Sequence, residues 1–103
     1  MKFINLTPHA INLNSGEVFP PSGQVARVTA GYSDFDTAGC CFATFGEVQG
    51  LPDPQEGTLY IVSGLVAGAV KGLREDVVAP ATGHPLAVRE SGQIVSVPGF
   101  VRA

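Results

Sequence analysis

Glycine and proline interrupt this chain so often that no long helix can form. The 103 residues include 13 Gly and 8 Pro. Inside a helix these residues cost about 1 and 3 kcal/mol, respectively, relative to alanine. The turn-forming residues recur at intervals of about eight to twelve, which is typical of all-β domains. The sequence therefore excludes a coiled coil or a helical bundle and predicts a mainly β fold.

Length and charge narrow the class of protein further. We expect a single domain over residues 1–103, because about 100 residues is a common domain size. Apolar residues make up 45% of the chain and charged residues only 15%, which excludes a disordered tail. The formal net charge is −3, with six Lys and Arg. So few cations neutralise few phosphates, which argues against general nucleic-acid binding.

The segments between turns are expected to be strands. Residues 58–63 are apolar on both faces, which predicts a central strand. The full set of expected strands is 2–6, 10–13, 17–19, 25–30, 40–48, 58–63, 76–79, 86–89 and 93–97.

One segment, at about residues 64–71, favours a short helix. Ser63 before it is a good N-cap residue, and Gly72 suits the C-cap. The side chains expected on its buried side are Leu65, Val66, Ala69 and Val70. The fold class predicted is therefore mainly β, a small barrel or sandwich with one short helix.

The apolar surplus predicts self-association. A domain of this size buries only about 60–65% of the surface of its unfolded chain, so apolar side chains remain outside. A patch of about 500 Å² would give about 12 kcal/mol of gross transfer free energy, much of it offset by the cost of association. We expect a homo-oligomer; the alternative is a monomer with scattered surface apolar residues.

Cysteine usage and targeting signals favour the cytoplasm. Cys40 and Cys41 are adjacent and form no disulfide framework, which suits a reducing compartment. The first residues lack the apolar region of a signal peptide. The longest apolar stretch, 59–70, is shorter than the roughly 20 residues of a membrane span, so we expect no membrane partner.

Two loop residues are candidates for binding a small anion. Thr82 and His84 lie between Pro80 and Pro85, and backbone amides in such a tight loop can hold an anion. The alternative is a hairpin loop in which Thr82 bonds to its own backbone.

Arginines are the second group of ligand-binding candidates. Arg27, Arg74 and Arg89 could each read a phosphate or carboxylate with two hydrogen bonds. For Arg74 the alternative is a local ion pair with the neighbouring Glu75 or Asp76.

A further candidate site lies near the N-terminus. Asn5, Thr7 and His9 alternate, so on a straight strand they share one face and could bind a polar ligand. The alternative is that Asn5 and Thr7 bond to backbone at a Pro8 kink, with His9 an exposed edge residue.

Catalytic and metal sites are not expected. Ser63, Asp76 and His84 supply the residue types of a hydrolase triad, but Ser63 lacks the Gly-x-Ser-x-Gly elbow. Neither the histidines nor the cysteines have zinc-binding spacing, and we expect no cofactor. No Lys or Arg flanks Cys40 and Cys41 to lower their pKa, so they are interpreted as structural.

Several strings together resemble an uncharacterised family of small phage, prophage and bacterial proteins with an Asn-Leu-Thr-Pro-His N-terminus. The resemblance covers most of the chain. It implies a phage-type setting, hence the host cytoplasm, and brings no activity or catalytic residue. The strings are residues 5–10, 21–23 with 25–28, 50–52, 57–63 and 74–80.

These observations favour binding over catalysis. We expect a non-catalytic homo-oligomer that sequesters a small anionic, nucleotide-like ligand, by analogy with small phage proteins that capture host defence signals. The net charge of −3 opposes an anion unless cations converge locally. One alternative is a protein-interaction or structural module, such as an inhibitor or virion component, and another is a small hydrolase.

Overall fold

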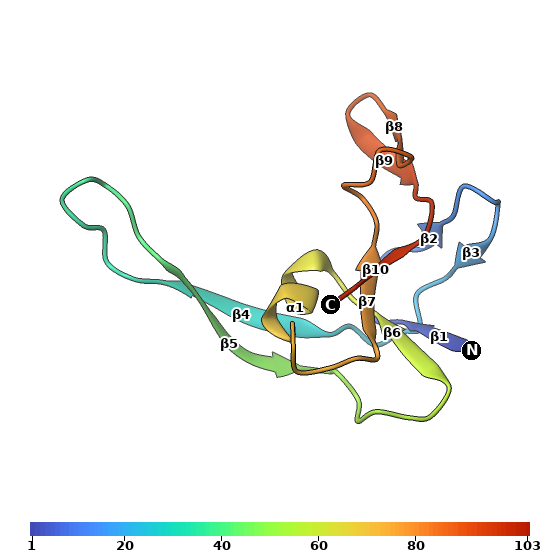
Figure 1. The fold of residues 1–103 in the computed structure, drawn as a ribbon, viewed down its shortest axis with the longest axis horizontal. Coiled ribbons are helices and arrows are strands. Elements are labelled where there is room, and N and C mark those ends of the chain that lie inside the picture. Colours follow the sequence, from blue (N-terminus) through green and yellow to red (C-terminus); the bar gives the residue numbers. More distant parts are fainter.

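A four-stranded sheet lies at the centre of the molecule (Figure 1). The structure is a computed structural model that describes residues 1–103, apart from the side chain of Ala30. The strand order is β1-β6-β7-β10; β6 runs parallel to both neighbours, and β10 runs antiparallel to β7. The bounds are Lys2–Asn5 (β1), Thr58–Ile61 (β6), Val77–Pro80 (β7) and Phe100–Arg102 (β10).

A short helix, α1, connects the parallel strands β6 and β7. It spans Gly64–Ala69, and Ser63 caps it, with the Val66 amide donating to Ser63 Oγ at 3.4 Å. The helix was therefore predicted at the right place, with the right N-cap. The C-cap was expected at Gly72 and is instead Val70, because the helix already ends at Ala69. Leu65 was expected on its buried side and is instead exposed, while Ala67 is buried. The helix packs on the sheet through Val66, Ala67 and the following Val70.

Each face of the central sheet carries its own apolar core. Tyr60 and Val77 point to the face that α1 covers, where Leu6 and Ala26 complete the packing. The side chain of Ile61 points to the opposite face and is fully buried. Successive residues of a strand face opposite sides, so a strand that is apolar throughout needs cover on both. The prediction of a central strand at this position is confirmed.

Two small hairpins cover the second face. One consists of Ile11–Asn12 (β2) and Val18–Phe19 (β3), the other of Val88–Glu90 (β8) and Gln93–Ser96 (β9). Three phenylalanine rings pack together in the core of this face, with neighbouring centroids 5.2 to 5.5 Å apart; they are Phe3, Phe19 and Phe100.

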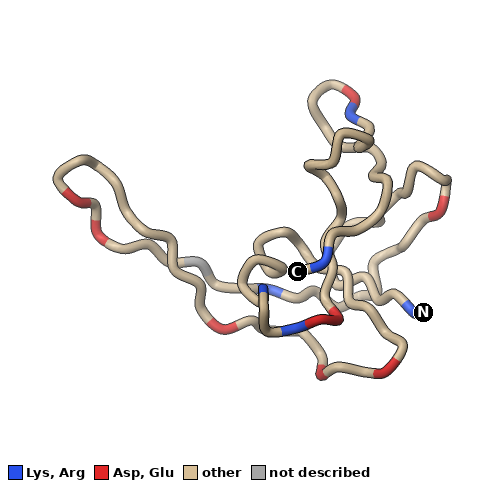
Figure 2. The backbone as a smooth tube through the Cα atoms, in the orientation of Figure 1, with Lys and Arg blue, Asp and Glu red and all other residues tan. Residues whose placement is uncertain are grey.

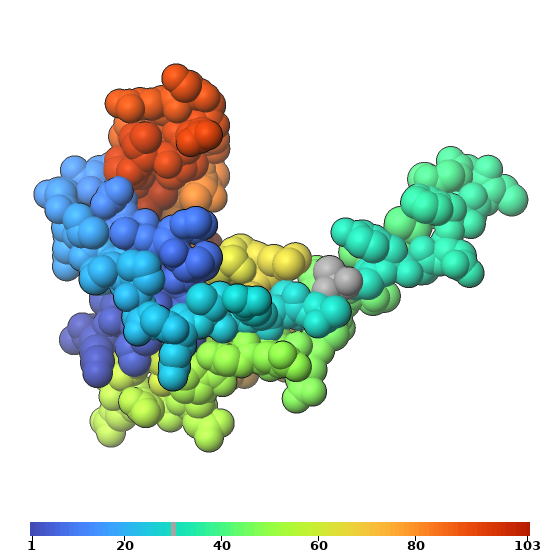
Figure 3. Space-filling view, turned by 180° about the vertical axis from the view of Figure 1, so that it is seen from behind, coloured from blue at the N-terminus to red at the C-terminus, as the bar shows by residue number. Residues whose placement is uncertain are grey.

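A third hairpin leaves the body of the molecule. Its strands are Arg27–Tyr32 (β4) and Ala43–Gln49 (β5), and we call residues 28–48 the arm. Figures 1 and 3 show it projecting far from the remaining chain. The radius of gyration is 15.3 Å, against about 13 Å for a compact chain of this length. The foot of the arm packs against the α1 core through Val28 and Val48.

The mainly β class with one short helix is confirmed, and the layering is sandwich-like. The strands of the described chain do not close into a barrel. The strand predicted at 25–30 begins at Arg27 and continues to Tyr32, and the one predicted at 40–48 begins only at Ala43. Strand β10 was not predicted. No helix among the described residues is long and apolar enough to cross a membrane.

Candidate functional site

The polar side chains near the N-terminus stabilise the fold through hydrogen bonds. Asn5 and Thr7 are buried. The Asn5 amide donates to the carbonyls of His9 (2.8 Å) and Phe19 (3.0 Å), and its oxygen accepts from the Thr7 backbone amide at 3.0 Å. These bonds occupy the hydrogen-bonding groups of the Asn5 side chain and leave none for a ligand. The alternative interpretation of this segment is therefore the one observed, with His9 exposed at the surface.

Three of the predicted ligand-binding residues lie close together beside the β8–β9 hairpin. Arg89 donates from Nη2 to the Thr82 carbonyl at 3.1 Å. His84 Nδ1 accepts from the Leu86 backbone amide at 3.0 Å, so this nitrogen is an acceptor. All three predicted residues are exposed. Thr82, His84 and Arg89 thus form one polar cluster at the surface.

A cleft of about 310 Å³ lies between the β2–β3 and β8–β9 hairpins, near the lower limit of ligand pockets. His9 and Thr82 line it together, with Asn12 and Ser96 as further polar groups. Two predicted candidate sites therefore meet at one cavity. Of the side chains described, no Lys or Arg lines it; Arg89 approaches through its bond to the Thr82 carbonyl.

The remaining predicted arginines belong to another part of the molecule. Arg27 pairs with Gln49 at the foot of the arm. Arg74 makes a two-pronged ion pair with Asp76, with both N–O distances 2.8 Å, and also donates to the Pro52 carbonyl. This pair raises the pKa of Arg74 and holds the pKa of Asp76 below its usual range. Arg74 is therefore engaged in structure, as its alternative interpretation stated.

The residues weighed for a hydrolase triad stay apart. Ser63 caps α1, Asp76 pairs with Arg74, and His84 accepts from Leu86 beside β8. Both cysteines are free thiols on the arm, Cys40 exposed and Cys41 half-buried. Within the described side chains, no three of His, Cys, Asp and Glu converge in a metal-binding arrangement.

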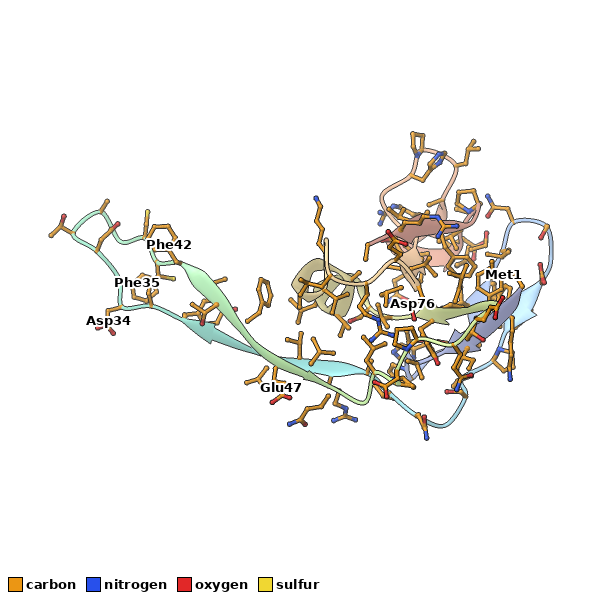
Figure 4. The ribbon with its side chains drawn as sticks, turned by 60° about the horizontal axis from the view of Figure 1, so that its bottom comes forward. Met1, Asp34, Phe35, Phe42, Glu47 and Asp76 are labelled. Atoms are coloured by element: carbon orange, nitrogen blue, oxygen red, sulfur yellow. The ribbon has the colours of Figure 1, made fainter. Side chains whose placement is uncertain are left out.

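The arm carries the most exposed aromatic side chains of the structure. Side chains this apolar are normally covered, and within the described chain none of these belongs to either apolar core. Their exposed fractions are 73% for Tyr32, 73% for Phe35, 78% for Phe42 and 50% for Phe45. Figure 4 shows Asp34, Phe35 and Phe42 near the far end of the arm, well away from Asp76 in the body.

The tip of the arm is a well-defined turn. Asp36 Oδ1 accepts from the amides of Ala38 (2.9 Å) and Cys40 (3.0 Å). Ser33 and Phe42 are joined twice, by Ser33 N to the Phe42 carbonyl and by Phe42 N to Ser33 Oγ. The exposed aromatic residues therefore stand on an internally hydrogen-bonded scaffold. Such a scaffold lowers the ordering cost of binding.

Sequence reasoning did not identify the arm, because it interpreted 25–30 and 40–48 as separate strands of the body. One signal was present: two β-rich segments on either side of a polar turn with Asp34, Asp36 and Gly39, a pattern typical of a hairpin. Comparison of the chain with protein-family models, with curated proteins and with solved structures finds no match.

Proposed function

We propose that this chain is a non-catalytic, homo-oligomeric binding protein that associates through its arm. The observation that carries the proposal is the presence of four exposed aromatic residues on the arm. Buried aromatics each cover about 150–250 Å², so these four side chains expose roughly 500 Å² in all. The register places Tyr32 and Phe45 on one face of the arm and Phe42 on the other, so this area is shared between two faces. Its burial would give about 12 kcal/mol of gross transfer free energy, before the cost of association.

The cleft between the β2–β3 and β8–β9 hairpins is the proposed place for a small ligand. A nucleotide-like anion would pack against its aliphatic wall and bond to His9 and Thr82. Arg89, already bound to the Thr82 carbonyl, is the cation within reach. The choice of a host defence signal as the ligand rests on the analogy with small phage proteins that capture such signals.

Light scattering tests the association. We expect the wild-type mass to be a multiple of 10.6 kDa at micromolar concentration, and the variant Tyr32→Ser, Phe35→Ser, Phe42→Ser to be monomeric. The three side chains are exposed, so the circular dichroism spectrum should be unchanged. A wild-type mass of one chain would overturn the proposal.

Calorimetry tests the ligand. We expect cyclic or linear nucleotides to bind the wild type and to bind Arg89→Ala at least about ten-fold more weakly, since a charge-assisted hydrogen bond contributes 1.5–3 kcal/mol. Arg27→Ala, at the foot of the arm, is the matched control and should bind like wild type. The absence of binding by any nucleotide would remove this part of the proposal.

The arm also favours a second candidate, a protein-interaction module that binds a host protein. An exposed, rigid aromatic hairpin can serve either a second copy or a foreign partner. A pull-down that returns one stoichiometric partner with the wild type, and none with the triple serine variant, would favour this candidate over self-association.

A further inference from the structure

We propose that the arm of one protomer docks on the α1 side of a second copy of this chain. The receiving surface consists of Leu65, Lys71, Leu73, Val101 and Arg102. Two such contacts, related by a two-fold axis, would form a dimer in which each chain gives its arm and receives the other. This inference rests on the proposed self-association and names the surface that accomplishes it.

The arm is acidic as well as aromatic. Residues 28–48 contain Asp34, Asp36 and Glu47 but no Lys or Arg. The rest of the chain then has six carboxylates and six cations, so the formal net charge of −3 lies on the arm alone. Figure 2 shows acidic positions along the arm and a group of basic positions around the helix and the C-terminal strand. The arm therefore selects a basic apolar surface.

The receiving surface has the complementary character. Leu65 and Leu73 are exposed on the helix and the turn after it. Val101 pairs with Ala79, which packs under the helix, so Val101 lies on the α1 face of the sheet. Arg102 pairs with Val78 of the opposite face and borders the receiving surface only through its guanidinium, which reaches the Glu75 carbonyl in the segment between α1 and β7. Val101 is exposed, so α1 leaves this edge of the sheet uncovered.

Two cations on this surface lack a carboxylate partner. In the described part of the chain, Arg74 with Asp76 forms the one ion pair. Lys71 is exposed, and Arg102 reaches only a backbone carbonyl, that of Glu75, at 3.5 Å. Both cations are thus free to meet the carboxylates of a docked arm.

The other exposed apolar surface of the body suits the arm less well. Leu86, Val88 and Val95 lie on and beside the β8–β9 hairpin. Its one cation, Arg89, bonds to the Thr82 carbonyl and is followed by Glu90. The formal charges of Arg89 and Glu90 cancel, so this surface offers the acidic arm no net positive charge.

Pairing of two arms with each other is disfavoured on charge and on area. It would bring three carboxylates from each chain together without a cation, and like charges in contact repel. It would also cover only about 500 Å² on each chain, less than the roughly 800 Å² per partner of a stable interface. A reciprocal dimer covers both an arm and a receiving surface, and so about twice the area per chain that paired arms would cover.

Cross-linking through the native thiols tests the docking. Cys40 and Cys41 lie at the tip of the arm and mark its position. An untagged wild-type chain is mixed with a tagged chain that carries Cys40→Ser, Cys41→Ser and Leu73→Cys, and a short bis-maleimide is added. We expect a covalent pair of one tagged and one untagged chain. The matched control replaces Leu73→Cys with Leu86→Cys, since Leu86 is 63% exposed and Leu73 77%; it should not cross-link.

Each other result has a distinct meaning. A multimeric mass by light scattering without a cross-link at Leu73→Cys would overturn the docking surface and leave the self-association standing. Cross-linking at Leu86→Cys would overturn the docking surface in favour of the surface beside the β8–β9 hairpin. Cross-linking of wild-type chains alone through their arm thiols would overturn it in favour of paired arms. A monomeric wild type would overturn both proposals.

A charge exchange supplies an independent readout. Asp34→Lys or Lys71→Glu alone should weaken the dimer about two- to five-fold, as expected for an exposed ion pair. The two changes combined in one chain should restore part of the loss. Additive weakening would count against direct contact between the acidic arm and the basic surface.

Discussion

At the residue scale, the polar side chains singled out for binding divide into those that hold the fold and those that are free. Asn5 uses its amide to join two backbone segments, and Arg74 is held by Asp76 and Pro52. Arg89 remains exposed, with one bond to a carbonyl. A polar side chain therefore indicates a ligand-binding site only where the structure shows that its hydrogen-bonding groups are not already occupied by neighbouring residues.

The Arg74–Asp76 pair makes stability depend on pH. The hydrogen bonds from Arg74 lower the folded-state pKa of Asp76. Its contribution is therefore complete above the ordinary aspartate pKa of about 3.9 and is lost as the pH falls through the lower folded-state value. We expect Asp76→Asn to reduce the free energy of unfolding by about 1–2 kcal/mol near neutral pH.

Urea unfolding of wild type and Asp76→Asn, at one protein concentration and several pH values, checks this prediction. The difference between the two proteins should shrink as the pH falls below about 3.9. A difference that stays constant down to acid pH would show that Asp76 acts through packing instead of charge.

At the element scale, the sequence predicted where the strands lie better than which strands pair with each other. The turn residues located β1, β6, the helix and the β8–β9 hairpin, because glycine, proline and capping serine act locally. The β4–β5 strands were recognised, but not as a free arm, since β-branched and aromatic residues suit a covered strand equally well. Pairing between segments as distant as β1 and β6 leaves no local signal. Nor could the meeting of His9 with Thr82 at one cleft be foreseen.

Gly50 joins the arm to the body and should tolerate no side chain. Its φ is +80°, and a Cβ there would lie 2.5 Å from the Val25 carbonyl oxygen. We expect Gly50→Ala to cost about 2–4 kcal/mol, from left-handed strain of about 1–2 kcal/mol and the clash with backbone. Thermal unfolding measures the loss.

Gly57→Ala is the control for this change. Gly57 has a φ of +72° but open space around its Cβ position, so only the backbone strain of about 1–2 kcal/mol applies. Equal losses for the two variants would show that the close contact between Gly50 and Val25 is unimportant.

At the scale of the whole molecule, the proposed self-association through the arm would make stability depend on protein concentration. A dimer that covers the arms is stabilised by mass action, so its unfolding temperature rises with protein concentration. Over about a hundred-fold increase we expect a rise of about 5 °C for a dimer of this size. Calorimetric scans across that range check it, and an unfolding temperature independent of concentration would indicate a monomer.

The pairing of β1 with β6 also determines the order in which the chain can fold. Strand β1 can pair only after β6 has been synthesised, and the sheet is complete only when β10 pairs with β7. The β4–β5 hairpin closes over the local segment 33–42 and can form early, whereas long-range strand pairing is slow. During synthesis on the ribosome, the aromatic hairpin therefore emerges before β6, β7 and β10, so its side chains are exposed before the body of the protein has formed.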